Sequence, residues 1–176
     1  MLQEKYKKEI IPMMRQKFGL KSDLAVPKIE KVVVNIGIGN EAKDEKSHES
    51  IVKDLSLITG QKPIFTLAKK AISAFKIRQG QPVGLKVTLR RKRMFDFLDR
   101  LINVVLPRTR DFRGLPEKSI DQNGNLNIGI KEQIIFPEIS QEDIRKIFSM
   151  EITVVTDTKD RNKAEELFKL MGFPIK

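Results

Sequence analysis

The sequence predicts an α+β fold, in which helices pack on one face of a largely antiparallel sheet and leave the other face free. Segments with helical and with strand-like patterns are mixed along the 176 residues, without the regular alternation that a parallel sheet requires. The strand-like segments alternate apolar and polar residues, which is the pattern of a sheet with one covered face. Since no stretch has the composition of a long linker, the sequence predicts one domain over residues 1–176, with a protruding basic loop near residues 67–81.

The first sixty residues predict a helix, a strand and a second helix. Apolar residues at helical spacing indicate a helix over residues 2–18. Pro12 is expected either to kink this helix or to mark its true start, and Gly19 is expected to end it. The β-branched stretch "IEKVVVNIGIG" (residues 29–39) is typical of a strand that runs into a glycine turn. The segment "SHESIVKDLSLITG" (residues 47–60) predicts a helix that its last glycine ends.

The middle of the chain predicts three short strands and one strong helix. "PIFTLA" (residues 63–68) has the composition of a strand, and "FKIRQGQPVGLKVTLR" (residues 75–90) predicts two more strands around a turn at residues 80–82. "MFDFLDRLINVVL" (residues 94–106) has a helical period, and Pro107 closes it. The inward face of this helix is expected to hold Phe95, Leu98, Leu101, Ile102 and Val105.

The last third predicts a turn, two strands and two helices. The Asn-Gly pair in "DQNGN" (residues 121–125) favours a hairpin turn ahead of an extended segment. A capping pattern predicts a short helix over residues 140–148, and "MEITVVT" (residues 150–156) predicts a strand. The final helix, within residues 159–173, is expected to stop at its glycine.

Positive charge is concentrated in one segment of the chain. The net charge is +11, and residues 55–95 hold ten Lys or Arg residues and no Asp or Glu. A charge that served solubility alone would be spread along the chain, so this segment predicts one surface that binds a polyanion such as a nucleic acid. The alternative is a basic face that is merely solvated.

The stretch "GLKVTLR" (residues 84–90) shows how a strand could present this charge. Successive side chains of a strand point to opposite faces. The apolar set, expected in the core, is Leu85, Val87 and Leu89. The polar set, expected on the free face, is Lys86, Thr88 and Arg90. Such a row suits structured RNA, which proteins recognise largely through phosphate, 2′-hydroxyl and shape.

The basic loop that precedes this strand also holds one aromatic residue. "LAKKAISAFKIRQGQ" spans residues 67–81, and Phe75 lies near its middle. Phe75 fits either a core position or a stacking residue at a loop tip, and the sequence pattern does not separate the two.

Composition and motifs argue against an enzyme. With no cysteine there are no thiolate ligands or nucleophiles, and the single histidine, His48 beside Glu49, is expected to be a solvated surface residue. "GIGNEA" (residues 37–42) is close to a dinucleotide-binding turn, but a charged stretch follows where a helix should open. No stretch is apolar enough for a membrane span or a signal peptide, which indicates a cytoplasmic protein. The sequence therefore predicts no cofactor, no metal site and no small-molecule substrate.

Several motifs of this sequence closely resemble one protein family. They are "KIEKVVVNIGIG" (residues 28–39), "GQKP" (60–63), "FKIRQG" (75–80), "GLKVTLR" (84–90), "PRTRDFRGL" (107–115) and "KEQIIFPEI" (131–139). In this order they resemble the bacterial-type family of large-subunit ribosomal protein five, the 5S-rRNA-binding protein of the central protuberance. The resemblance covers nearly the whole chain.

The resemblance implies a structural constituent of the large ribosomal subunit. Such a protein anchors 5S rRNA in the central protuberance beside large-subunit rRNA, with the free face of its sheet on the RNA. Its basic loop touches peptidyl-site tRNA, and another surface meets a small-subunit head protein in an intersubunit bridge. A ribosome-assembly RNA chaperone and a dinucleotide-dependent enzyme are the alternatives.

The resemblance also implies roles for individual residues. For 5S rRNA, matching positions and the basic strand suggest Asn35, Gln61, Lys62, Lys86, Thr88 and Arg90. The loop that faces tRNA would present Lys69, Lys70, Phe75, Lys76, Arg78 and Gln79. The intersubunit bridge would use Arg108, Arg110 and Arg113. The basic residues Arg91–Arg93 have no assigned partner.

Overall fold

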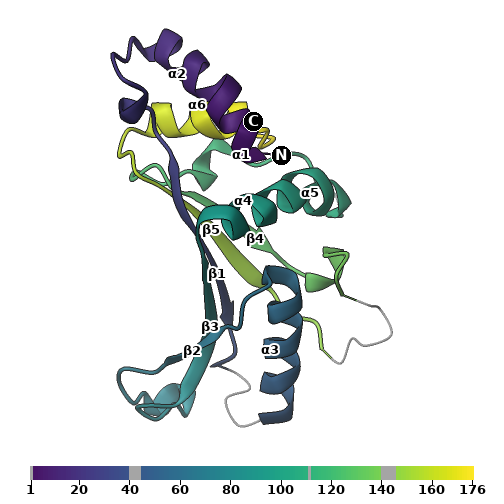
Figure 1. Cartoon of the computed structure of the whole chain (residues 1–176). Coiled ribbons are helices and arrows are strands. Elements are labelled where there is room, and N and C mark those ends of the chain that lie inside the picture. The colour runs from purple at the N-terminus through teal and green to yellow at the C-terminus, as the bar shows by residue number, and fades with distance from the viewer. Residues whose placement is uncertain (1, 40–44, 111, 140–145) are drawn as a thin grey trace. The chain divides into compact units, whose positions relative to one another are not determined.

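The computed structural model describes residues 2–39, 45–110, 112–139 and 146–176 and confirms the α+β class (Figure 1). Its sheet is antiparallel and has five strands in the order β2-β3-β1-β5-β4. The strands are β1 (Ile29–Gly37), β2 (Ile64–Leu67), β3 (Pro82–Leu89), β4 (Leu126–Ile130) and β5 (Met150–Thr156). Which face of the sheet meets RNA stays a prediction.

The chain forms two compact units, each built from segments far apart in the sequence. The terminal unit comprises residues 1–32, 90–128 and 153–176, and the hairpin unit comprises residues 33–89 and 129–152. The sequence-based expectation of a single domain over residues 1–176 stays a prediction.

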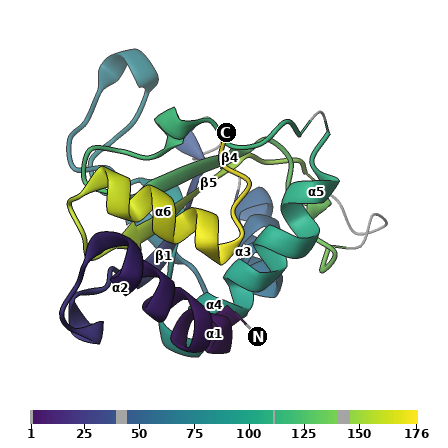
Figure 2. The ribbon, with the colours of Figure 1, turned by 90° about the horizontal axis from the view of Figure 1, so that it is seen from above.

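Helices dominate the terminal unit. The first is α1 (Leu2–Lys5) and α2 (Ile11–Phe18), joined by a π-helical turn over Tyr6–Ile10. The second is α4 (Arg91–Arg100) and α5 (Leu106–Arg108), joined by a π-helical turn over Leu101–Val105. The last is α6 (Arg161–Met171). Figure 2 shows α1 against α4, so the two interrupted helices pack together.

Both interrupted helices widen immediately before a proline. The N–H of Ile11, which precedes Pro12, donates to the Tyr6 carbonyl, and the N–H of Leu106, which precedes Pro107, donates to the Leu101 carbonyl. These bonds reach back five residues instead of four. Because a proline ring crowds the carbonyl four residues earlier and supplies no N–H, the wider turn lets each helix continue. The helix expected over residues 2–18 therefore runs through Pro12, and Gly19 ends it with a φ of 60°.

Two hydrogen bonds secure the chain at the start of β1, one from the N-terminal helix and one from Asp157. The Tyr6 hydroxyl donates to the Pro27 carbonyl at 3.0 Å. Burial, with a smaller contribution from the Asp157 carboxylate, raises the pKa of Tyr6 to about 12. The phenol thus stays protonated at neutral pH and keeps its donor. Asp157 in turn accepts from the Lys28 N–H at 2.9 Å, which secures the same segment.

The hairpin unit contains α3 (Glu45–Thr59), which lies against β3 (Figure 1). Its buried residues Ile51, Leu55 and Ile58 have the spacing of one helical face, as the sequence predicts. The helix over residues 47–60 is therefore confirmed within this range.

Three details of the sequence prediction are wrong. Residues 75–79 form no strand, because β3 pairs with β2, and residues 68–81 form the loop between them. The second interrupted helix, which begins three residues earlier than expected, buries Met94 and Phe97 and leaves Phe95 and Ile102 half-buried. Of the helix expected over 140–148, residues 140–145 lie outside the described ranges, and the rest is not helical.

Gly84 is fixed by the close approach of three strands. It lies opposite Thr66 in the antiparallel register of β2 and β3. A Cβ at Gly84 would come within 2.7 Å of Thr66 Oγ1 and 2.8 Å of the Ile36 carbonyl oxygen. The second contact is with backbone, which cannot rotate away, so this position requires glycine.

We therefore expect Gly84→Ala to lower the free energy of unfolding by about 1–3 kcal/mol, as overpacked substitutions do. Gly37→Ala on β1 is the matched control, because a Cβ there meets nothing within 4 Å. Urea unfolding followed by circular dichroism compares the two variants. Equal midpoints for both would show that the sheet accommodates the added carbon.

Asp121 organises the predicted turn at residues 121–125. Its carboxylate accepts the N–H groups of Asn123 and Asn125, both at 2.8 Å, and the Asn125 amide at 2.9 Å. Burial pushes the pKa of Asp121 upward, but the hydrogen bonds from Asn125 and Asn123 outweigh burial and hold the pKa below its usual value. The ionised carboxylate thus stabilises the folded turn.

Asp121→Ala should cost about 1–2 kcal/mol of stability at pH 7, because three hydrogen bonds to a charged group are lost. Since the pKa is depressed in the fold, this contribution is present above pH ~4 and disappears as the pH falls through the folded-state pKa. Unfolding curves at pH 7, 5, 4 and 3 should show the gap to the wild type closing. A gap that is unchanged at pH 3 would contradict the role of the charge, and Gln122→Ala in the same turn is the control.

Candidate nucleic-acid interface

Strand β3 presents polar side chains on one face, as its alternation predicts. Leu85, Val87 and Leu89 are buried, whereas Lys86 is exposed and Thr88 is half-buried. The neighbouring strand β1 has the same alternation, with Val34 and Ile36 buried and Asn35 half-buried between them. The less buried residues of the two strands form an open face, here defined by Asn35, Lys86 and Thr88.

Gln61 is held beside this open face by a backbone contact. Strand β2 begins at Ile64, which pairs with Lys86, so no β2 residue lies opposite Thr88. The Gln61 side chain takes the missing place and donates from Nε2 to the Thr88 carbonyl at 3.3 Å. Its amide oxygen and second N–H keep their capacity for a ligand. The adjacent Lys62 is exposed. Five of the six predicted residues lie within the hairpin unit: Asn35, Gln61, Lys62, Lys86 and Thr88.

Arg90, the sixth predicted residue, belongs to the terminal unit. Its guanidinium contacts Glu30 at 3.2 Å, and 53% of its side chain is exposed. An exposed pair of this kind contributes little to stability, so the remaining N–H groups of Arg90 stay available. The next residues, Arg91–Arg93, are exposed at the start of α4, whose first turn holds no acid. Their charge adds to the positive end of the helix dipole instead of offsetting it.

The basic loop between β2 and β3 is closed by its own backbone (Figure 1). Ala68 donates to the Gln81 carbonyl and accepts from Gly80, both at 2.9 Å. Farther out, Ile72 and Ile77 exchange two hydrogen bonds of 3.0 and 3.2 Å. The tip is a 3-10 turn over Ser73–Phe75, followed by Lys76 with a φ of 54°.

The predicted side chains of this loop all face solvent. Phe75 is 71% exposed at the tip, which excludes the core position that the sequence left open. The exposed polar residues are Lys69, Lys70, Lys76, Arg78 and Gln79. Because backbone groups close the loop and residues 55–95 contain no acid, the fold leaves these cations free to meet an anion.

Of the three arginines predicted for the bridge, Arg108 ends α5, and Arg110 and Arg113 follow it in the terminal unit. Arg108, Arg110 and Arg113 are exposed. The chain after them is anchored by the C-terminal residues: Leu115 donates to the Pro174 carbonyl at 2.7 Å and accepts from Lys176 at 2.9 Å.

The features that could have indicated an enzyme remain weak in the structure. His48 is only 6% exposed and stacks obliquely on Phe65 with ring centroids 6.1 Å apart, so the expected solvated position is wrong. It lies on the face of α3 that packs on the sheet.

Within the described residues, no three His, Cys, Asp or Glu side chains are grouped to hold a metal. Ala42 of the dinucleotide-like turn lies outside those residues. No helix in the described part is long and apolar enough to cross a membrane.

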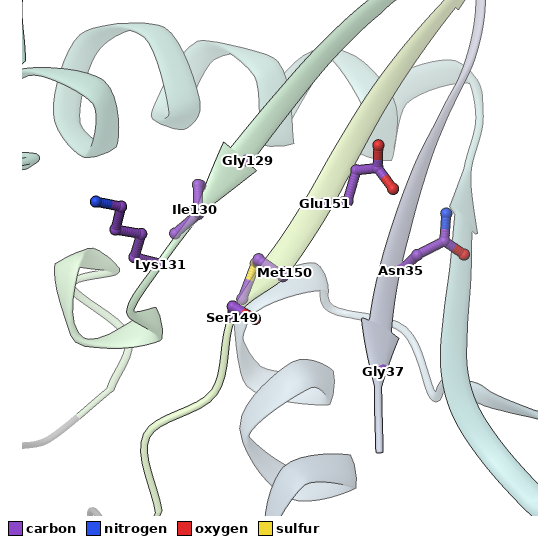
Figure 3. Close-up of a pocket in the computed structure, with 8 residues that line it drawn as sticks. All are labelled: Asn35, Gly37, Gly129, Ile130, Lys131, Ser149, Met150 and Glu151. Carbon is purple, nitrogen blue, oxygen red and sulfur yellow. The ribbon is translucent and has the colours of Figure 1, made fainter. Parts of the chain in front are cut away.

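A hollow of about 430 Å³ opens on the same unit, beside the open face (Figure 3). Its lining includes Asn35, Gly37, Gly129, Lys131, Ser149 and Glu151. Of these residues, only Asn35 is among the site residues expected from the sequence. Glu151 is one of the alternate, exposed positions of β5, and the alternation of residues 150–156 could have indicated its exposure. The sequence could not indicate the other residues of the hollow, because they lie on other strands of the sheet.

Comparison with known proteins gives one consistent family. A profile described as "Ribosomal protein L5" matches residues 22–78, and a profile for the C-terminus of the same ribosomal protein family matches residues 82–175. The large ribosomal subunit protein uL5 of Carboxydothermus hydrogenoformans is 50% identical over 174 residues, which cover 99% of this chain and 97% of that protein. The uL5 proteins of Clostridium tetani and Desulforamulus reducens are 51% and 53% identical, over 99% of this chain and 97% and 96% of theirs.

Proposed function

The chain belongs to the ribosomal protein L5 family, and from this premise we propose that it anchors 5S rRNA in the central protuberance of the large ribosomal subunit. It is a ribosomal protein of the large subunit, so ribosomal RNA is among its partners and the cytoplasm is its compartment. The family consists of structural ribosomal proteins, which confirms the expectation that the chain is not an enzyme.

One observation carries the 5S rRNA proposal: within the acid-free segment, strand β3 buries Leu85, Val87 and Leu89 and exposes Lys86 on its other face. Lys86 and Thr88 stand beside Asn35 on neighbouring strands, and Gln61 is fixed at the end of β3. Lys62, Lys86 and Arg90 would neutralise phosphates. The amide and hydroxyl groups would orient the RNA through sugar or base contacts. The absence of aromatic residues on the open face favours contact with RNA backbone and shape over stacking on the sheet.

The closed basic loop is proposed to contact peptidyl-site tRNA. Its backbone hydrogen bonds preorganise the tip, which lowers the entropy that binding must overcome. Exposed Lys69, Lys70, Lys76 and Arg78 offer charge, Gln79 offers hydrogen bonds, and Phe75 offers a flat apolar surface. This combination is typical of contacts to a folded nucleic acid.

The exposed Arg108 at the end of α5, with Arg110 and Arg113 after it, is proposed to form the intersubunit bridge to a small-subunit head protein. The anchoring of the chain after them by the C-terminal residues gives a fixed platform for such a contact.

The salt dependence of 5S rRNA binding tests the proposed contacts between cations and phosphate. If about five cations contact phosphate, log K should fall against log salt with a slope of roughly −3.5 to −4.5. Lys86→Ala should weaken binding and make the slope less negative by roughly 0.7–0.9. Filter binding of 5S rRNA across a salt series measures both effects.

Lys53→Ala is the matched control for this experiment, because Lys53 is an exposed lysine on α3. It should leave the slope unchanged. A nearly flat response of the wild type would refute the electrostatic account, and equal effects of the two variants would refute the assignment of the open face.

Shortening the basic loop tests whether the loop and the 5S rRNA surface act independently. Replacing residues 70–78 with two glycines leaves the bonds between Ala68, Gly80 and Gln81 in place. Binding of 5S rRNA should stay within about twofold of the wild type, while tRNA binding to the peptidyl site of reconstituted ribosomes should weaken. Phe75→Ala should have a smaller effect in the same direction. Loss of 5S rRNA affinity in the replacement would show that the two surfaces are not separate.

A further inference from the structure

We propose that the hollow beside the open face holds an unpaired guanine of the bound RNA, with Glu151 as its acceptor. This inference rests on the proposed function and deepens it, because it gives one residue a base-specific role. Figure 3 shows the arrangement: Glu151 projects from β5, Asn35 projects from the adjacent β1, and Lys131 extends away from both.

The shape of the hollow suits a flat ring. Gly37 and Gly129 line it without side chains, and a Cβ at either position would meet nothing within 4 Å. A planar base can therefore approach the sheet backbone closely at these glycines. The hollow is open on the exposed side of the sheet, so a base can enter it while its sugar and phosphate remain outside.

The chemistry of the hollow selects a hydrogen-bond donor. Glu151 is exposed, and within the described residues its carboxylate has no hydrogen bond or ion pair. A carboxylate accepts hydrogen bonds and repels phosphate, so it cannot bind the phosphate groups of the RNA backbone. Guanine presents adjacent N1–H and N2–H groups, which match the two oxygens of a carboxylate. The other bases present a single donor group on this edge.

Asn35, on the strand next to β5, completes the match at O6, the acceptor that adjoins N1–H on the same edge of guanine. Its amide can donate to the O6 acceptor of the same guanine. Unpaired bases of folded RNA are available for such contacts on their Watson–Crick edges. A basic side chain of another protein could also bind Glu151, but Asn35 places the hollow next to Lys86 and Thr88, which favours RNA.

Two physical accounts of Glu151 predict effects of opposite sign. If it is only a negative charge on a basic surface, Glu151→Gln removes repulsion and tightens RNA binding, most strongly at low salt. If it accepts two hydrogen bonds from guanine, the same change leaves one guanine donor facing an amide N–H. Binding should then weaken roughly 5- to 150-fold, the range typical of a bidentate base contact.

The experiment measures 5S rRNA binding by the full chain with Glu151→Gln and with Glu132→Gln as the matched control. Glu132 is exposed close to Lys131 but does not line the hollow. Kethoxal, which reacts with N1 and N2 of unpaired guanine, should find one guanine that the wild type protects and Glu151→Gln leaves reactive. Gly129→Val, which adds a branched side chain to the hollow at a position where a Cβ meets nothing within 4 Å, should weaken binding in the same way.

The outcomes distinguish the two proposals. If the wild type fails to bind 5S rRNA, the proposed function is wrong, and this inference fails with it. If the wild type binds and depends on Lys86 but Glu151→Gln binds equally or more tightly, only the guanine site is wrong. An unchanged kethoxal pattern would also overturn it and would leave a basic protein partner as the ligand of Glu151. Melting curves that match the wild type establish that the variants are folded.

Discussion

Strand β3 can bury only every second side chain, and this geometric limit determines the surface of the whole hairpin unit. Leu85, Val87 and Leu89 are taken up by the core, so Lys86 and Thr88 must point the other way. A shift of the strand by one residue would bury the lysine without a partner, which costs far more than an exposed cation. The same interaction that stabilises the sheet therefore fixes which side chains, Lys86 and Thr88, lie on the open face.

The contacts that hold the register are made without the basic side chains. Gly84 lets three strands approach one another, Gln61 satisfies the Thr88 carbonyl, and backbone hydrogen bonds close the loop. Because the fold depends on these groups, the lysines and arginines between residues 61 and 89, all within the described part of the chain, form no ion pair. Stability and charge are thus carried by different atoms of the same segment, which allows a dense positive field in a protein of marginal stability.

The sequence predicted what local periodicity determines and failed where distant segments decide. The alternation of residues 84–90 gave the correct faces, since one face is buried along the whole strand. The alternation of Phe75 and Ile77 was misleading, because β3 finds its partner in residues 64–67 and leaves Phe75 at a loop tip. His48 has polar neighbours in sequence, yet its helix face meets Phe65. Glu151 escaped notice because the hollow exists only once β1, β5 and β4 are adjacent.

A carboxylate beside exposed cations, such as Glu151 near Lys86, has a physical logic of its own. Phosphate contacts by lysine and arginine supply affinity, but they are the same for every nucleotide, so they cannot fix the register of the RNA. The Glu151 carboxylate repels phosphate, so it lowers the affinity of any complex in which the RNA backbone lies against it. That loss is offset only when a base edge that carries hydrogen-bond donors enters the hollow. Misregistered complexes would keep the repulsion and lack the base contact. Glu151 would thereby act on specificity through both its attraction for one base and its repulsion of the alternatives.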